Sequence, residues 1–338
     1  MPHESSAAAG WRSRITGARR ISWRSFARRD TSSPRKAARV GVPSQSPELL
    51  VAGSIALDTR DGPFGRLEEE LGGSALYFAL AASLVMPVTL VAPVGVDAAR
   101  RVERVLSHRP IDTALLQVLP ARTYRWRAHQ HDGRNIDLGS SDDIYDTWEP
   151  ATPAGFDGWA FVGSMRPDRQ AQLVEMLGGA SLLAADAMLS YVHARPPAAE
   201  EVLRRASWYY CNQDEFAALG GSDPSQFRSR WSLRGLVVKA GPGGVSAHTE
   251  DGVVRVPALT GRPAVDTTGA GDAVAGGMLS RWLTTGGQPN GLQDALVWGV
   301  ACASLAISDV GIRGLAEATG ELLAERVVEV EECLLRES

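Results

Sequence analysis

Short apolar runs alternate with helical patterns along most of this chain, and this alternation constrains the fold more than any other feature. The segments "LLVAGSI" from Leu49 and "VTLVAPV" from Val88 have the length and apolarity of buried strands, whereas "GGSALYFALAASLV" and "DAARRVERVLSH" have helical spacing. The rhythm continues through the apolar runs "WAFVGS", "SLLAAD", "WYYCN" and "LRGLVVKAG". Strands that alternate with helices predict right-handed crossovers, so we expect an α/β fold whose central sheet is mostly parallel and covered on both faces.

Two polar segments interrupt this rhythm. Residues 57–70, "LDTRDGPFGRLEEE", carry a turn signal at Asp61-Gly62, and "ARTYRWRAHQHDGRNIDLG" alternates around the hairpin-forming pair Asp132-Gly133. Together with "TALLQVL", they predict a small antiparallel sheet, with lid segments near residues 57–70 and 112–140. A lid over the carboxyl ends of the parallel strands would cover the place where such folds bind ligands.

The N-terminal segment differs in composition from the rest of the 338 residues. Residues 1–47 hold ten Lys and Arg against two acids, a net charge of +8, so the overall −4 leaves −12 for the remainder. We expect residues 1–46 to be a disordered, dispensable tail, with a targeting segment or an over-extended start as alternatives, and residues 47–338 to form one domain. An acidic body predicts no nucleic-acid partner.

The cysteines and the most apolar stretch bear on the compartment. The three cysteines are far apart and odd in number, which fits a reducing compartment and neither a disulfide framework nor a zinc pattern. Residues 75–96 are long enough to suggest a membrane span, but Pro87 and Pro93 interrupt them. We therefore expect a helix followed by a buried strand there, no membrane partner, and a cytoplasmic protein.

The segment "AVDTTGAGDAVAGGM" is the most informative for chemistry. Thr268, Gly269, Ala270 and Gly271 run into Asp272 and then into a helical pattern. Small residues that lead into a helix present several backbone N–H groups to one point, where the helix dipole adds positive charge, so the segment predicts an anion cradle. It is not a Walker loop, and Val274 stands where the dinucleotide fingerprint needs Gly or Ala.

Asp272 inside that cradle has two explanations. A carboxylate beside a phosphate site can accept the proton of an acceptor hydroxyl while the cradle holds the transferring phosphoryl group. It can equally cap the helix that follows, which is a common use of Asp. The segment alone does not separate a catalytic base from a helix cap.

Further motifs upstream make the chain resemble the ribokinase-like sugar and nucleoside kinases of the PfkB family. "DTTGAGDAVAGGML" resembles the C-terminal signature of that family, "VAGSIALD" its first strand, and "LGGSALYFALAASL" its Gly-Gly helix. "NQDEFAAL" resembles its Asn-x-x-Glu motif, and "VVKAGPGGV" its Lys/Gly segment at the nucleotide site. The resemblance runs in order from residue 49 to about residue 320, and it implies a three-layer sandwich with a small β lid.

The resemblance also implies a role for each matching position. Asp272 takes the place of the catalytic base, and Gly269, Ala270 and Gly271 that of the anion hole. The substrate site would include Asp58, Gly72, Gly73 and Tyr77; the nucleotide site would include Asn212, Lys239, Gly241, Gly244 and Thr268; and Glu215 would hold Mg²⁺ through water, with Asp186 a weaker candidate for the same shell.

Several of these residues also have purely structural explanations. Asp58 could be a turn acid after a strand, and the pair Gly72-Gly73 could simply end a loop. Asn212 and Glu215, three positions apart, could form a capping box, which does not exclude metal organisation through water. Lys239 could lie at the surface, but as the sole lysine after residue 36 we expect it to contact the nucleotide.

The lid sequence holds two more candidate groups. His129 and His131 lie on one face of a strand, but no third ligand is evident, so we expect solvated histidines and not a metal site. Arg122, Arg125 and Arg127 could meet the substrate, and we expect them to cover a solvated face.

Tyr77 departs from the resemblance. Many sugar-specific members have Asn at this position, which reads sugar hydroxyls, whereas a phenol could stack on or hydrogen-bond to a different ring. The departure makes ribose or fructose doubtful as acceptor and favours nucleosides or inositol-like cyclitols.

Taken together, we predict an ATP- and Mg²⁺-dependent kinase that transfers the γ-phosphoryl group to a hydroxyl of a sugar, nucleoside or cyclitol. The alternative is a non-catalytic ligand-binding or regulatory protein that keeps the kinase fold. A requirement for a monovalent cation and a homodimer formed through the lid are left open.

Overall fold

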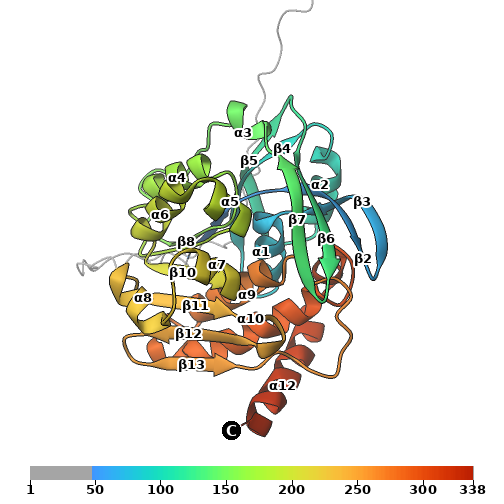
Figure 1. The fold of residues 1–338 in the computed structure, drawn as a ribbon. Helices are drawn as coiled ribbons and strands as arrows, with labels where there is room; N and C mark the ends of the chain where they lie inside the picture. Colours follow the sequence, from blue (N-terminus) through green and yellow to red (C-terminus); the bar gives the residue numbers. More distant parts are fainter. Residues whose placement is uncertain (1–47, 338) are drawn as a thin grey trace, which may run out of the picture. The chain divides into compact units, whose positions relative to one another are not determined.

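The computed structural model describes residues 48–337, so the tail predicted for residues 1–46 lies outside the described residues. Within them the predicted alternation is confirmed: a nine-stranded sheet lies between layers of helices, and a smaller sheet stands beside it (Figure 1). Residues 75–96 form a helix and then a strand, as expected. No helix in residues 48–337 is long and apolar enough to cross a bilayer.

The large sheet has the strand order β13-β12-β11-β10-β9-β8-β1-β4-β5. Every neighbouring pair from β11 to β5 is parallel, and only β12 and β13 run antiparallel to their neighbours. The strands are β1 (Leu49–Ala52), β4 (Val88–Gly95), β5 (Ile111–Leu119), β8 (Trp159–Val162), β9 (Leu182–Asp186), β10 (Trp208–Asn212), β11 (Gly235–Lys239), β12 (Val245–Thr249) and β13 (Val253–Val256).

The sheet separates two hydrophobic clusters, because successive strand side chains point to opposite faces. In β1, Leu49 and Val51 belong to one cluster, and Leu50 and Ala52 belong to the other. The first cluster includes residues of α1 (Ser74–Ala82), α2 (Ala99–Leu106), α9 (Ala270–Thr284), α10 (Leu292–Ala306), α11 (Arg313–Ala316) and α12 (Gly320–Glu337). The second includes residues of α3 (Ile144–Thr147), α4 (Pro167–Met176), α5 (Leu189–Ala194), α6 (Pro196–Arg205), α7 (Gln213–Ala218) and α8 (Pro224–Arg230).

The small sheet has the order β3-β2-β6-β7 and is the predicted lid. Its strands are β2 (Ala56–Gly62), β3 (Gly65–Gly72), β6 (Tyr124–His131) and β7 (Arg134–Ser141). The two hairpins are antiparallel, but they join through a parallel pairing of β2 with β6. The expectation that "TALLQVL" belongs to the lid is wrong, because it forms most of β5 and pairs with β4 at the edge of the large sheet.

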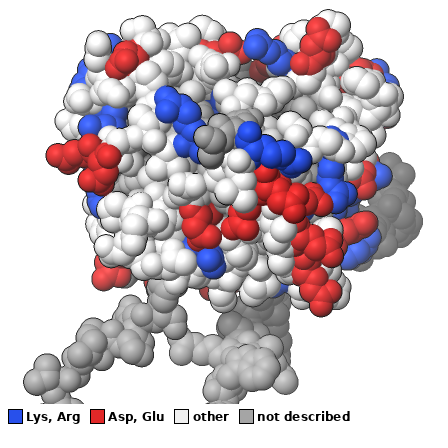
Figure 2. All heavy atoms as spheres, turned by 90° about the horizontal axis from the view of Figure 1, so that it is seen from below, with Lys and Arg blue, Asp and Glu red and all other residues white. Residues whose placement is uncertain are grey.

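Charged side chains are distributed over the surface in both signs. On the face shown in Figure 2, Asp and Glu side chains are interspersed with Lys and Arg side chains among uncharged residues. Such mixing is the usual state of a solvated protein surface.

Candidate active site

A cavity of about 240 Å³ lies between the carboxyl ends of the parallel strands and the lid. Its wall combines lid residues from β2, β6 and β7 with residues at the ends of β9, β10 and β11 and at the start of α9. Ten of the residues predicted for the site line it: Asp58, Gly73, Tyr77, Asn212, Glu215, Lys239, Thr268, Gly269, Gly271 and Asp272. Segments more than 200 positions apart in sequence thus meet at one cavity, at the edge where α/β sheets bind ligands.

The start of α9 has the geometry of an anion cradle. Gly269 precedes the helix with φ +74°, a left-handed conformation that favours glycine, and the helix begins at Ala270. The first N–H groups of a helix have no partner within it; here Gly271 and Asp272 of the first turn line the cavity, whereas the Ala270 N–H donates to the Thr267 carbonyl at 3.4 Å. Backbone donors and the helix dipole therefore favour an anion at this point.

Close packing holds α9 in place. A methyl group on Gly276 would lie 2.5 Å from the carbonyl oxygen of Phe78 in α1, and one on Gly277 would lie 2.7 Å from the Sγ of Cys302 in α10. Glycine thus lets two helices approach α9 closely. Rigid neighbours on both sides limit the movement of the cradle and of Asp272 in the first helical turn.

Asp58 and Asp272 place two carboxyl groups at the same cavity. Burial raises the pKa of Asp58 to about 7 and that of Asp272 to about 6. The carboxyl of Asp58 also packs against Gly72 at the end of β3, where a methyl on this glycine would lie 2.1 Å from Asp58 Oδ2. Gly72 therefore supports the Asp58 side chain and does not itself line the cavity.

Lys239 supplies positive charge next to the cradle. Its Nζ lies 3.9 Å from Asp186 Oδ2, and it would lie 2.7 Å from a methyl on Gly271. Burial lowers the pKa of Lys239, but the carboxylates of Asp186, Glu215 and Asp272 outweigh that effect and raise it, so the ammonium form is favoured. In return, Lys239 lowers the pKa of Asp272, opposing the effect of burial.

Asn212 and Glu215 form the capping box that the sequence allowed. The Asn212 Oδ1 accepts the Glu215 amide at 2.8 Å, and Glu215 Oε2 accepts the Asn212 amide at 2.8 Å. Both residues nevertheless line the cavity, and burial raises the pKa of Glu215. Capping and a role in ligand binding are therefore compatible here.

The cavity wall fits a magnesium ion carried by phosphates. Among residues 48–337 there is no cluster of three or more His, Cys, Asp or Glu side chains that could hold a metal. Mg²⁺ is commonly held through water by one or two carboxylates together with substrate phosphates, and Glu215 and Asp186 provide such carboxylates. The Oδ1 of Asp186 is buried with no hydrogen-bond partner in the described part of the chain, which leaves it an acceptor for a ligand.

Tyr77 packs against the cradle. Its side chain is 1% exposed, and its ring lies so close to Gly269 that a methyl there would be 2.2 Å from Cδ1. The ring face is therefore occupied by the protein, whereas the buried Tyr77 hydroxyl has no partner among the described residues. Stacking of Tyr77 on a substrate ring, one of the two roles expected for it, is excluded in this arrangement.

Besides Gly72, three predicted residues do not line the cavity. Ala270 begins α9 but does not line the wall, and Gly241 starts a short 3-10 helix (Gly241–Gly243) after β11. Gly244 lines a second hollow of about 460 Å³ that begins at Val238 and Ala240, on either side of Lys239. Of the predicted nucleotide residues, Asn212, Lys239 and Thr268 thus line the first cavity, Gly244 lines the second hollow, and Gly241 lines neither.

Sequence reasoning missed most of the lid side of the cavity. The additional residues that line it include Ser54, Ser74, Tyr124, Trp126, Asn135, Ser164 and Met188. Tyr124 and Trp126 stand two positions apart on one strand, so the period-2 spacing of aromatics in "YRW" could have revealed them. Ser164 and Asn135 gave no comparable signal.

The remaining lid candidates lie elsewhere. The rings of His129 and His131 stack at 6.4 Å, and neither lines the cavity. Arg125 pairs with Asp97 and Glu69, and Arg127 donates to the Leu138 carbonyl at 3.2 Å. These arginines support the lid at its surface.

Comparison with known proteins identifies the family and agrees with the fold. The sequence model described as pfkB family carbohydrate kinase matches residues 56–318. A cytidine kinase from Thermococcus kodakarensis is 28% identical over 249 residues, which make up 69% of this chain and 87% of that protein. The structure of Burkholderia thailandensis nucleoside kinase in complex with inosine is similar with a TM-score of 0.68 and 21% identity, covering 83% of this chain and 98% of that one. The structure of the fructokinase from Vibrio cholerae O395, with fructose, ADP and calcium ion bound, is similar with a TM-score of 0.67 and 20% identity, covering 83% of this chain and 99% of that one. At these identities the two structures support the fold alone.

Proposed function

Because this chain belongs to the pfkB family of carbohydrate kinases, it is a phosphotransferase that acts on a hydroxyl of a sugar or nucleoside, and we propose that its acceptor is a nucleoside. In this proposal ATP donates the phosphoryl group. The acceptor hydroxyl belongs to the ribose and lies between Asp58 and Asp272.

The aromatic wall of the lid carries the choice of a nucleoside. Tyr124 and Trp126 line the cavity from β6, and Met188 lines it from the segment between β9 and α5. Trp126 Nε1 and Asn135 Oδ1 are buried without partners in residues 48–337, so the same wall offers one free donor and one free acceptor. A nucleobase has a flat face to pack on aromatic side chains and an edge with both kinds of polar group, whereas a free sugar has no such face.

The relatives named above are consistent with this choice. The Thermococcus kodakarensis relative is a cytidine kinase, and a structural neighbour binds inosine. The Vibrio cholerae neighbour binds fructose on the same fold, so the choice depends on this chain's own lid residues.

The proposed reaction assigns the chain's own groups as follows. Asp272 accepts the proton of the ribose hydroxyl as that oxygen attacks the γ-phosphorus, and ADP leaves. The N–H groups at Gly269, Ala270 and Gly271 stabilise charge on the transferring phosphoryl oxygens, and Lys239 adds a fixed cation beside them. A bound Mg²⁺ would neutralise the phosphate oxygens, with Glu215 and Asp186 holding it through water.

Exclusion of water completes the proposal. Water competes with the ribose hydroxyl for the phosphoryl group, and a lid that covers the cavity removes that competitor.

The lid also supports the proposal of a homodimer, because Ile136 and Leu138 on its edge strand β7 are 51% and 52% exposed. Light scattering in solution tests that point. As the reaction draws on the cellular ATP pool, we place it in the cytoplasm.

A panel assay tests the acceptor. ADP formation is measured with cytidine, inosine, adenosine, ribose, fructose and inositol. At least one nucleoside should exceed ribose and fructose in kcat/KM by about a hundredfold or more, because buried polar groups are left unpaired by a substrate without a base. Equal or better turnover of a free sugar would refute the nucleoside proposal while leaving the kinase activity in place.

A variant pair tests the mechanism. Asp272→Asn should lower kcat by about 10²- to 10⁴-fold, the usual contribution of a general base, with ADP binding retained. Asp214→Asn is the matched control, since this carboxylate lies in the first turn of α7, its side chain is 58% exposed, and it does not line the cavity. Unchanged kcat in Asp272→Asn would exclude Asp272 as the base.

A further inference from the structure

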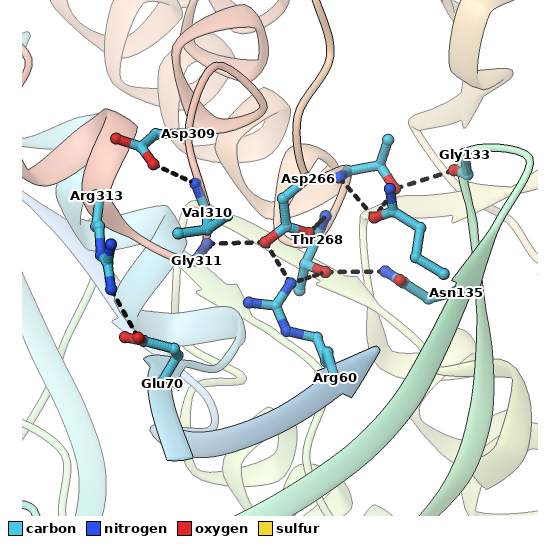
Figure 3. A network of polar contacts seen from close by, with 12 residues as sticks. Arg60, Glu70, Gly133, Asn135, Asp266, Thr268, Asp309, Val310, Gly311 and Arg313 are labelled. Atoms are coloured by element: carbon cyan, nitrogen blue, oxygen red, sulfur yellow. Dashed lines mark hydrogen bonds and ion pairs between the residues drawn. The ribbon is translucent and has the colours of Figure 1, made fainter. Parts of the chain in front are cut away.

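A fully buried arginine connects the lid to the anion cradle. Arg60 lies in β2, and its side chain and that of Asp266 are both 0% exposed. The guanidinium forms an ion pair with Asp266 and donates from the same nitrogen to Thr268 Oγ1 at 2.6 Å (Figure 3). Asp266 and Thr268 lie directly before the cradle glycine Gly269, yet Arg60 itself does not line the cavity.

Asp266 organises the backbone on both sides of this contact. Its Oδ1 accepts the Thr268 amide at 3.0 Å, and its Oδ2 accepts the Gly311 amide at 2.8 Å, as Figure 3 shows. The carboxylate therefore holds the segment before the cradle against the loop that follows α10. Arg60 is the positively charged partner of this buried carboxylate, and a buried charge is stable only when it is paired and hydrogen-bonded.

Two other lid strands reach the same segment. Gln130 in β6 accepts, through Oε1, the Thr267 amide at 3.1 Å and the Thr267 hydroxyl at 3.2 Å. Asn135 in β7 donates to Thr268 Oγ1 at 3.0 Å, and the Gly133 carbonyl accepts from the Thr267 hydroxyl at 2.9 Å. Residues of β2, β6 and β7 thus all form hydrogen bonds to Asp266–Thr268. We call this set, Asp266–Thr268 with Arg60, Gln130 and Asn135, the lid latch.

The latch determines what the Thr268 hydroxyl can do. A hydroxyl has two acceptor positions and one proton. Arg60 and Asn135 both donate to Thr268 Oγ1, which occupies both acceptor positions. No protein acceptor for the proton of this hydroxyl occurs among the described residues, and Thr268 lines the cavity. The proton is therefore available to an oxygen atom of a ligand at the cradle.

We propose that Arg60 is a positioning residue for phosphoryl transfer. Arg60 reaches from the lid and holds Asp266–Thr268 in place. In this position the Thr268 hydroxyl donates to the phosphoryl group, and the cradle amides point toward it. Lid closure and formation of a competent cradle are then one event, because the same contacts make both. The inference rests on the proposed role of the cradle in binding phosphate, but it does not depend on the acceptor being a nucleoside.

The arginine is specifically suited to this role. One nitrogen, Nη1, donates to both the carboxylate and the hydroxyl, and the planar guanidinium fixes the direction of its two N–H bonds, whereas a lysine ammonium rotates freely about its bond to the side chain. Two of its nitrogens, Nε and Nη2, have no partner within residues 48–337, so the burial of Arg60 is not explained by a complete set of bonds. A residue retained for stability alone could be replaced by an apolar side chain together with Asp266.

Kinetics of three variants test the proposal with whichever acceptor the wild type phosphorylates best. Arg60→Ala should lower kcat by about 10- to 100-fold, as expected for misplacement of cradle groups by about 1 Å, with the KM for ATP within about threefold of the wild type. The kcat of Arg60→Lys should lie between that of Arg60→Ala and that of the wild type. The matched control is Arg66→Met, on the same hairpin with a 62% exposed side chain, and it should leave kcat unchanged.

Two further readouts separate positioning from a purely structural role. Added guanidinium at low millimolar concentration should raise kcat of Arg60→Ala and leave the wild type unchanged, because it can refill the site next to Asp266. Hydrogen exchange of the ligand-free protein should become faster at residues 266–271 in Arg60→Ala and stay slow in α10, and this result needs no substrate.

If Arg60→Ala does not fold, Gln130→Met tests the same latch from β6. This substitution removes the acceptor for the Thr267 amide. The Gln130 residue is 5% exposed and does not line the cavity. Faster exchange at residues 266–271 with lower kcat supports the proposal. Folded Arg60→Ala or Gln130→Met protein with wild-type kcat and unchanged exchange overturns it, whereas a wild type that phosphorylates only sugars refutes the nucleoside acceptor and leaves the latch standing.

Discussion

Substitution of Gly269 by alanine tests whether the cradle is held by its contact with Tyr77. Gly269 has φ +74°, and an added methyl would lie 2.2 Å from Tyr77 Cδ1 and 2.3 Å from Cγ. Ordinary van der Waals contact begins at 3.4 Å, so the two groups must separate by more than 1 Å. The fully buried ring of Tyr77 has little room to retreat, and we expect the cradle backbone to move instead.

The size of the effect follows from that displacement. A shift of about 1 Å in catalytic groups costs about 10²-fold in rate, which corresponds to about 2.7 kcal/mol in transition-state free energy. The left-handed conformation adds about 1 kcal/mol of backbone strain for alanine, which acts on the stability of the fold. We therefore expect Gly269→Ala to remain folded and to lose about two orders of magnitude in kcat/KM.

Steady-state kinetics measure the loss of kcat/KM in Gly269→Ala, and thermal unfolding, measured in parallel, shows whether the variant remains folded. Gly155→Ala is the matched control, because Gly155 has φ +67° but nothing within 4 Å of the added methyl, so it carries the strain without the clash. In a Tyr77→Ala background, the additional loss caused by Gly269→Ala should shrink to a few-fold. A Gly269→Ala enzyme within threefold of the wild type, or an equal loss with and without the Tyr77 ring, would refute the reasoning.

Three further predictions concern the carboxylates of the cavity. The base Asp272 must be ionised, so kcat/KM should fall as the pH drops below about 6, the raised pKa of Asp272, which is far above the 3.8 of an ordinary Asp; a pH profile that is flat down to pH 5 would contradict this. Lys239→Met should shift that limb to higher pH, because the ammonium lowers the pKa of Asp272; an unshifted limb would show that the two groups do not interact. Asp58 has a folded-state pKa of about 7 against 3.8 unfolded, so the folded protein binds this proton more tightly, and the stabilisation present below pH 3.8 is lost as the pH rises through 7. Asp58→Asn should therefore raise Tm at pH 8 by at least about 2 °C, given a few kcal/mol of relieved desolvation, with a smaller gain at pH 5; an equal or lower Tm at pH 8 would count against it.

Most of the fold could be predicted from local sequence, and its one clear error has a physical cause. Buried parallel strands appear as short apolar runs, and the runs from Leu49, Val88 and Trp159 are all strands of the large sheet. The segment "TALLQVL" is expected to join the polar lid segments, but it lies within β5 (Ile111–Leu119). This strand forms the open edge of the large sheet and none of its residues is fully buried, so its exposure resembles that of the lid strand β7.

The candidate site was only half predictable. Glycine-rich turns and acids next to strand ends have local signatures, and the resemblance of those segments to the PfkB family singled out Asp272, Lys239 and the pair Asn212/Glu215, whose own neighbours left structural roles open. Arg60 has no such signature: one arginine in a polar hairpin becomes a buried ion pair only through Asp266, 206 positions away. Contacts of that separation are decided by the topology of the lid, which local patterns do not encode.

Unfavourable features of this molecule are concentrated at the cavity. Carboxyl groups with raised pKa at Asp58 and Asp186 and the unpartnered hydroxyl of Tyr77 all lie at the same cavity wall. Each is a cost that the surrounding core must offset, and none contributes to packing. Phosphates with a magnesium ion and a polar acceptor would provide the missing partners, so binding energy is available for closing the lid. Because the latch joins three lid strands to the segment before the cradle, that closure reaches the phosphoryl-binding groups directly, whereas α1 and α10 hold the body of α9 at Gly276 and Gly277.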